Sequence, residues 1–236
     1  MRNQESSPNS IVRHLEHTLS SKCEGIHDIE VGIHGGIKGR FTLSIPDSYA
    51  QNTPRPLVCI LHYAGQPTRF YGRPLLEQLY LSPLEHLEPI IFAPESLGGQ
   101  WHSAENESFV MSILNATLKS FMIDKRKIMI SGYSMGGVGV FHYINAYPDV
   151  FSNGISLAGC PSGRLEPKSP ILMLASVSDD IFSYEQIHKE CTIANRKGYP
   201  VTLRSVSASN HYDVQSFSAA MPGALAWLNA QWNREH

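Results

Sequence analysis

The segment Lys127-Ile-Met-Ile-Ser-Gly-Tyr-Ser-Met-Gly-Gly137 constrains the fold of this chain more than any other. It begins with β-branched and apolar residues, passes through Gly132-Tyr133-Ser134-Met135-Gly136, and continues into a helical pattern. This order predicts a strand, a sharp turn and a helix. Glycine is needed on both sides of Ser134 because any side chain there would collide across the bend.

A Gly-x-Ser-x-Gly sequence at a strand-to-helix turn is the nucleophile elbow, which lifts its serine above the carboxyl end of a sheet. The helix that follows directs its free N–H groups and positive dipole end at Ser134, where negative charge would develop during a nucleophilic attack. The alternative interpretation is a glycine-rich turn that merely requires small residues.

Strand-like and helix-like segments alternate along the rest of the chain. We predict a hairpin of two short strands between Val31 and Ile45, broken by His34-Gly35-Gly36. Further strands are predicted at 57–61, 89–93, 128–131, 154–157, 171–177 and 201–206, and helices at 70–80, 105–121, 135–147, 182–197 and 214–232. The alternation predicts an α/β fold, a doubly wound and mostly parallel sheet of about eight strands with helices on both faces.

The domain organisation follows from length and composition. The chain has 236 residues and no linker rich in Pro, Gly or Ser, which predicts a single domain over residues 11–236 after a disordered polar segment at 1–10. About ten residues, Cys160–Pro170, separate two of the strands, too few for a cap domain. The formal net charge of −2 gives no electrostatic reason to expect nucleic acid. No apolar run reaches the roughly 18 residues of a membrane span, and the oligomeric state is left open.

Cysteine usage and the N-terminus bear on the compartment. The four cysteines are scattered and lack metal-ligand spacing. Residues 1–10 contain no apolar stretch typical of a signal peptide. We therefore predict a reduced, cytoplasmic protein, and a processed secreted form stays open as the alternative.

A serine nucleophile requires a base, and the base requires a carboxylate that orients it. The strand at 171–177 ends in Ser178-Asp179-Asp180, and the strand at 201–206 is followed by Ala208-Ser209-Asn210-His211. Because parallel strands end at one edge of a sheet, both segments are expected beside Ser134. The order serine, acid, histidine is that of doubly wound hydrolases.

Asp179 is our choice for the acid because it stands two residues beyond Val177, which leaves Asp180 to cap the helix near Phe182. The reverse assignment of Asp179 and Asp180 stays open. Asp213 is a weaker candidate, since it lies at the start of the last helix and suits a first-turn charge.

Of the eleven histidines, His211 alone satisfies both the chain order and the position after a strand. His62 and His102 are expected near the site as wall or support. The others are interpreted as surface or satisfied core residues: His14, His17, His27, His34, His86, His142, His188 and His236.

An oxyanion hole requires two backbone donors. One is expected from Met135, directly after the nucleophile, and the other from the segment Leu61–Gln66 that follows the strand at 57–61. We predict Ala64 as this second donor, with Tyr63 as the next choice. The alternative for the segment is an ordinary turn.

Five residues on loops at the carboxyl edge are candidates for the wall of a substrate pocket: Tyr63, Gln66, Trp101, His102 and Pro161. For Trp101, packing at the surface is an equally good interpretation.

Four segments carry a resemblance to a known family: Phe41–Pro46, Pro56–His62, Ile123–Gly137, and Tyr147–Phe151 with Gly159. The chain resembles the α/β-hydrolase superfamily and, within it, compact esterases of the polyhydroxybutyrate-depolymerase, feruloyl-esterase and phospholipase/carboxylesterase type. The resemblance extends from about residue 40 to the C-terminus. The elbow is specific to the superfamily, whereas the other segments only suggest the subgroup.

The resemblance implies hydrolysis of a carboxylic ester or thioester through an acyl-enzyme, with a small-molecule substrate and no metal or cofactor. Ser134, Asp179 and His211 match the triad, and Ala64 and Met135 match the oxyanion donors. The alternatives are a non-catalytic ligand-binding or protein-interaction member of the same fold, or a serine peptidase or acyltransferase.

The chain departs from the family pattern at three places. Tyr63 stands where a glycine is usual after Leu-His, Ala175-Ser176 replaces the His-Gly before the acid, and Asn210 replaces the glycine before the base. These departures leave every triad member in place, so they bear on the substrate more than on the chemistry.

Overall fold

The protein is built around one sheet of eight strands. The computed structural model describes residues 8–33 and 36–234. The strands are β1 (Gly25–Gly32), β2 (Lys38–Ile45), β3 (Arg55–Leu61), β4 (Ile90–Pro94), β5 (Ile123–Tyr133), β6 (Asn153–Leu157), β7 (Ile171–Ser176) and β8 (Val201–Val206). Their order across the sheet is β1-β2-β4-β3-β5-β6-β7-β8.

The sheet is parallel from β4 to β8 and antiparallel at one edge, where β2 pairs with β1 and β4. This confirms the predicted mostly parallel sheet and its hairpin. The first hairpin strand begins at Gly25 rather than Val31, since His27, Asp28 and Glu30 interrupt the apolar pattern on this half-exposed edge strand. His34 and Gly35, expected in the hairpin turn, lie outside the described residues.

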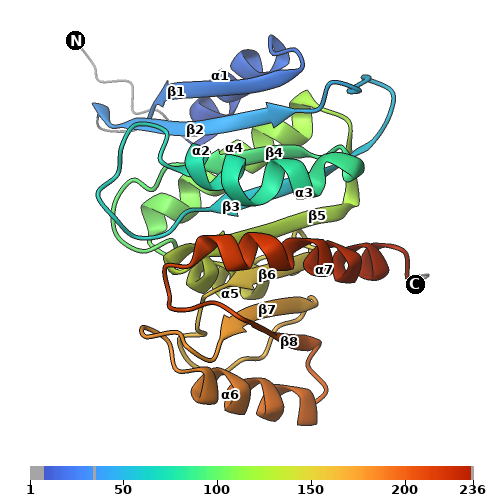
Figure 1. Ribbon diagram of the computed structural model, residues 1–236. Helices are drawn as coiled ribbons and strands as arrows, with labels where there is room; N and C mark the ends of the chain where they lie inside the picture. The colour runs from blue at the N-terminus through green and yellow to red at the C-terminus, as the bar shows by residue number, and fades with distance from the viewer. Residues whose placement is uncertain (1–7, 34–35, 235–236) are drawn as a thin grey trace.

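Helical segments cover both faces of the sheet. They are α1 (Pro8–Ser20), α2 (Gly72–Leu75), the π-helical η2 (Leu76–Tyr80), α3 (Leu81–Leu84), the 3₁₀ turn η3 (Glu85–Leu87), α4 (Ala104–Ser120), α5 (Met135–Ala146), α6 (Tyr184–Arg196) and α7 (Val214–Trp232). Figure 1 shows α2, α3 and α7 crossing in front of the sheet, with α1, α4 and α5 behind it. None of the helices in the described part of the chain is long and apolar enough to cross a bilayer.

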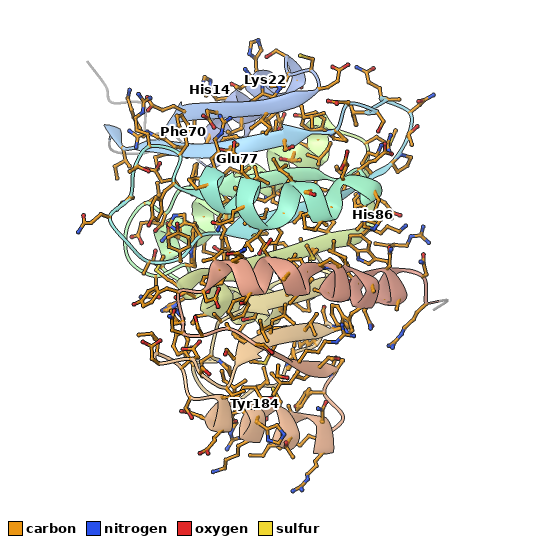
Figure 2. The ribbon with its side chains drawn as sticks, viewed as in Figure 1. His14, Lys22, Phe70, Glu77, His86 and Tyr184 are labelled. Atoms are coloured by element: carbon orange, nitrogen blue, oxygen red, sulfur yellow. The ribbon has the colours of Figure 1, made fainter. Side chains whose placement is uncertain are left out.

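Each face of the sheet has its own apolar core. One core joins the strands to residues of α1, α4, α5 and α6, and the other joins them to α2, η2, α3 and α7. The segment from α2 to η3 runs along the strand direction, since Phe70, just before it, lies toward the left of Figure 2 and His86, near its end, lies toward the right. Parallel strands buried on both faces explain the continuous apolar runs of β3 and β7.

Two predicted boundaries were wrong. Residues 8–10 belong to α1, so the predicted disordered segment does not extend to residue 10, and residues 1–7 lie outside the described part. The helix predicted at 70–80 continues as helical turns to Leu87, because Pro83 stands in the first turn of α3, where proline is tolerated. That the chain forms a single domain stays a prediction.

The turn between β5 and α5 brings three backbone segments into close contact. Ser134 has φ 54° and ψ −113°, a conformation that is strained for a residue with a side chain. A Cβ on Gly136 would lie 2.0 Å from the carbonyl oxygen of Leu61, and one on Gly132 would lie 2.5 Å from the carbonyl carbon of Gly136. The two glycines therefore allow α5 to start directly against the end of β3.

Replacing Gly136 by alanine should push α5 away from β3. We expect Gly136→Ala to lower the free energy of unfolding by about 1–3 kcal/mol or more, as overpacking does, and urea denaturation measures this change. Gly32→Ala is the matched control, because a Cβ there meets nothing within 4 Å. Equal stability of the two variants would contradict the proposed close contact.

Candidate active site

The structure brings Ser134, His211 and Asp179 into one hydrogen-bonded series. The Nε2 atom of His211 lies 2.8 Å from the hydroxyl oxygen of Ser134. Its Nδ1 atom lies 2.9 and 3.0 Å from the two carboxylate oxygens of Asp179. The side chains of His211 and Asp179 are 4% and 2% exposed, so water hardly competes for this pair.

The Asp179 carboxylate determines which nitrogen of His211 carries the proton. The Asp179 carboxylate also accepts hydrogen bonds from the amides of Ile181 (2.9 Å) and Phe182 (2.8 Å), which fix its orientation. An ionised carboxylate only accepts, so Nδ1 of His211 is assigned the proton and Nε2 is free to accept from Ser134. This is the tautomer that a general base requires.

The other two acids near the site do not reach the imidazole. Asp180 does not cap the following helix as we predicted; α6 is capped by Ser183, and the Asp180 carboxylate accepts from the backbone amide of His211 at 2.9 Å. Asp213 caps α7 by accepting from the amide of Ser216. Hydrogen bonds, first of all from the Ser209 amide, lower the pKa of Asp213 to about 2.

The loop after β3 is held in place by a buried histidine. His62 is 3% exposed, and burial lowers its pKa. Its Nε2 accepts from the Ser96 amide at 2.9 Å, so Nδ1 carries the proton and donates to the Tyr63 carbonyl at 2.7 Å. The indole of Trp101 donates to the His62 carbonyl at 2.8 Å. Two successive carbonyls of the loop are thus bonded to buried groups.

These bonds orient the amides that we predicted as oxyanion donors. In a trans peptide the N–H points away from the C=O, so the Ala64 amide points away from the His62 ring and the Tyr63 amide away from Trp101. Within residues 8–33 and 36–234, no acceptor is bonded to the amides of Ala64, Tyr63 or Met135. None of the three N–H groups has a protein acceptor in this part of the chain, and their role as oxyanion donors, with the choice between Ala64 and Tyr63, stays a prediction.

The five pocket candidates lie in different surroundings. Trp101 is 1% exposed and packs on His62, with ring centroids 4.8 Å apart, so the prediction that it lines a pocket is wrong. Its role as support was not visible in the sequence, because nothing there indicates which aromatic ring lies beneath the loop. Gln66 is exposed, and the half-buried ring of Tyr63 packs against Tyr71.

His102 and Pro161 line a cavity of about 480 Å³ along the outer face of α5. Val138, Phe141 and Leu165 supply apolar surface to this cavity. Val138 lies one turn from the nucleophile, since its amide donates to the Ser134 carbonyl at 2.9 Å. We call this cavity the α5 groove.

Comparisons of the sequence with known proteins give two partial matches. Residues 147–236 match the model of a family described as secretory lipase. The chain is also 26% identical over 152 residues to feruloyl esterase D of Neurospora crassa, covering 55% of this chain and 50% of that protein. The chain thus spans about half the length of this curated relative.

The match to a secretory family corrects one expectation. We predicted a cytoplasmic protein, and this match points to an extracellular one instead, so the prediction was wrong. The scattered cysteines carried too little information, since Cys59 and Cys191 are buried free thiols whose packing does not depend on the compartment.

Solved structures resemble most of the chain. A thermostable esterase superposes with a TM-score of 0.72 at 18% identity, covering 87% of this chain and 62% of that one. The fluorophosphonate-binding serine hydrolase F of Staphylococcus aureus superposes with a TM-score of 0.70 at 12% identity, covering 88% of this chain and 99% of that one. The resemblance to esterases of the α/β-hydrolase type is confirmed, and the chain has the α/β-hydrolase fold.

Proposed function

We propose that the protein is a serine hydrolase that cleaves carboxylic esters through an acyl-enzyme. The observation that carries this proposal is the hydrogen-bonded series from Ser134 through His211 to Asp179 at the carboxyl edge of the sheet. The similarity to a lipase family and to a feruloyl esterase supports an ester as the substrate.

In this mechanism His211 takes the proton of Ser134 as the serine oxygen attacks the ester carbonyl. Asp179 keeps the imidazole in the required tautomer and stabilises the imidazolium that forms. His211 then passes the proton to the leaving alcohol, or to a thiol if the substrate is a thioester. Water then gives a proton to His211 as its oxygen attacks the acyl carbon. The bond from that carbon to the Ser134 oxygen breaks, His211 returns the proton to Ser134, and the acid leaves.

Negative charge develops on the carbonyl oxygen in each half of the reaction. The amides of Met135 and Ala64 supply the hydrogen bonds to this oxygen, and the N-terminus of α5 adds its positive dipole end. The His62 ring and the Trp101 indole bond two carbonyls of the loop after β3. Because these bonds fix the loop, the Ala64 donor is positioned before the substrate arrives.

The α5 groove is our proposal for the acyl-binding site. Its lining on α5 extends from Val138, one turn from Ser134, to Ala146 at the end of the helix, and Phe141 supplies apolar surface between them. The wall at His142 is held by hydrogen bonds of both His142 and Tyr147 to Glu107. An acyl chain attached to Ser134 could extend along this surface and bury apolar area.

The competing proposal is a ligand-binding or protein-interaction protein on the same fold, since a fold does not establish an activity. A peptidase or an acyltransferase would use the same three side chains. Reaction with a fluorophosphonate separates the binder from the enzymes, and a panel of ester, thioester and amide substrates separates the enzymes from one another.

Loss of a triad member should abolish hydrolysis. We expect Ser134→Ala and His211→Ala to reduce kcat for a p-nitrophenyl ester by about 10⁴–10⁶, and Asp179→Asn by about 10⁴. His188→Ala, on the exposed side of α6, is the control and should retain full activity. Fluorophosphonate labelling should likewise be lost or strongly reduced in the three triad variants and retained in His188→Ala. Folded wild-type protein that neither labels nor hydrolyses any ester would favour the binding protein.

Filling the α5 groove should affect long acyl chains selectively. We expect Val138→Trp to lower kcat/KM for p-nitrophenyl octanoate about tenfold or more relative to the acetate, because a long chain loses its apolar contacts. Asn115→Trp, at an exposed position of α4, is the control. If the ratio of kcat/KM for the octanoate to kcat/KM for the acetate is unchanged, the acyl chain binds outside the α5 groove.

A further inference from the structure

Every polar group of His211 has a partner, and the partners are two pairs of consecutive residues. Ser134 and Asp179 bond the two ring nitrogens. The residue before Ser134, Tyr133, donates its hydroxyl to the His211 carbonyl at 2.6 Å. The residue after Asp179, Asp180, accepts from the His211 amide at 2.9 Å.

The main chain of His211 requires such partners because of its place in the fold. It lies in the loop between β8 and α7, where neither a sheet ladder nor a helix supplies hydrogen bonds. The residue is nevertheless 3% exposed, so unbonded backbone groups would be costly. Two side chains, Tyr133 at the end of β5 and Asp180 in the loop after β7, therefore supply the hydrogen bonds that secondary structure supplies elsewhere.

Tyr133 is a rigid link between the nucleophile and the base. It is 2% exposed, and its ring packs edge-on against Phe217 with centroids 5.2 Å apart. Burial raises the pKa of its hydroxyl, so the hydroxyl remains a donor. Because the ring is fixed by packing and Tyr133 is the last residue of β5, its side chain sets the distance from the elbow to the His211 backbone.

Asp180 bonds the other main-chain group of His211. Its carboxylate is on the loop that carries the acid, and the hydrogen bond from the His211 amide lowers its pKa, so the group stays ionised. A charged acceptor makes a stronger bond to an amide than a neutral one. The loop that orients the imidazole thus also holds the backbone from which the imidazole projects.

We propose that Tyr133 and Asp180 are positioning residues that hold the main chain of His211, so that its ring meets Ser134 and Asp179 at once. This inference rests on the proposed hydrolase function. Without these two bonds the loop between β8 and α7 can shift while the fold remains intact. A displacement of about 1 Å is enough to cost a reaction of this kind roughly 100-fold.

Three variants test the proposal. Tyr133→Phe removes the hydroxyl and keeps the ring. Asp180→Ala removes the acceptor, whereas Asp180→Asn keeps an acceptor oxygen at the same place. The control is Tyr80→Phe, which removes another buried hydroxyl, bonded to Ser131 at 2.7 Å, on η2.

Two measurements distinguish positioning from general stability. For a short p-nitrophenyl ester we expect Tyr133→Phe and Asp180→Ala to lower kcat about 10- to 100-fold with little change in KM. Asp180→Asn should recover most of the loss, and Tyr80→Phe should stay close to wild type. By proton NMR, the downfield signal of the Nδ1 proton between His211 and Asp179 should broaden or vanish in Tyr133→Phe and Asp180→Ala, and persist in Tyr80→Phe. His211→Ala assigns this signal.

Wild-type kcat and an unchanged Nδ1 signal in folded Tyr133→Phe would overturn the role of Tyr133. Equal losses in Asp180→Asn and Asp180→Ala would overturn the acceptor role of Asp180. If Tyr133→Phe fails to fold, the comparison of Asp180→Ala with Asp180→Asn decides whether the main chain of His211 is held as proposed. The NMR signal needs no substrate, so it tests the positioning of His211 even if the wild-type protein hydrolyses no ester. Absence of hydrolysis by the wild-type protein would refute the proposed function and leave the NMR test of positioning unaffected.

Discussion

The parallel pairing of β3, β5, β6, β7 and β8 is the constraint on which the rest of the molecule depends. It places the carboxyl ends of these strands at one edge, so that residues 77 positions apart in the sequence, Ser134 and His211, come within 2.8 Å. At this edge the elbow joins the end of β5 directly to α5. The helix can start there only because Gly136 has no side chain, so that the backbone of α5 can contact the carbonyl of Leu61.

The loops at this edge have few backbone hydrogen bonds of their own, and buried side chains replace them. His62 and Trp101 hold the loop after β3. Asn106 does the same for residues 96–100, where its amide group bonds the backbone at Leu97, Gly98 and Gln100. Tyr133 completes the pattern at the loop before α7. Buried side chains thus fix the backbone of each of these loops, which suits a site that must be formed before its substrate arrives.

Much of the fold could be predicted because its signals are local. Continuous apolar runs marked β3 and β7 to within two residues, the bounds predicted for β8 agree with the structure, and the helices α4 to α7 followed from their periodicity. The failures also have local reasons. Polar residues hid the first half of β1, and the proline at 83 concealed the helical turns that follow Tyr80. At the site, the order of serine, acid and histidine along the chain indicated three residues that the structure does bring together.

What the sequence determined by itself is the kind of chain this is: an alternation of strands and helices, with a serine between glycines at one strand end and an acid and a histidine after two later strands. Only the tertiary structure decided how these groups are held. The bonds of Asp180 and Tyr133 to His211 join residues 31 and 78 positions apart. Such contacts depend on strand order and loop path, which local pattern does not encode, because a buried hydroxyl or carboxylate can bond any backbone group that the fold brings within reach.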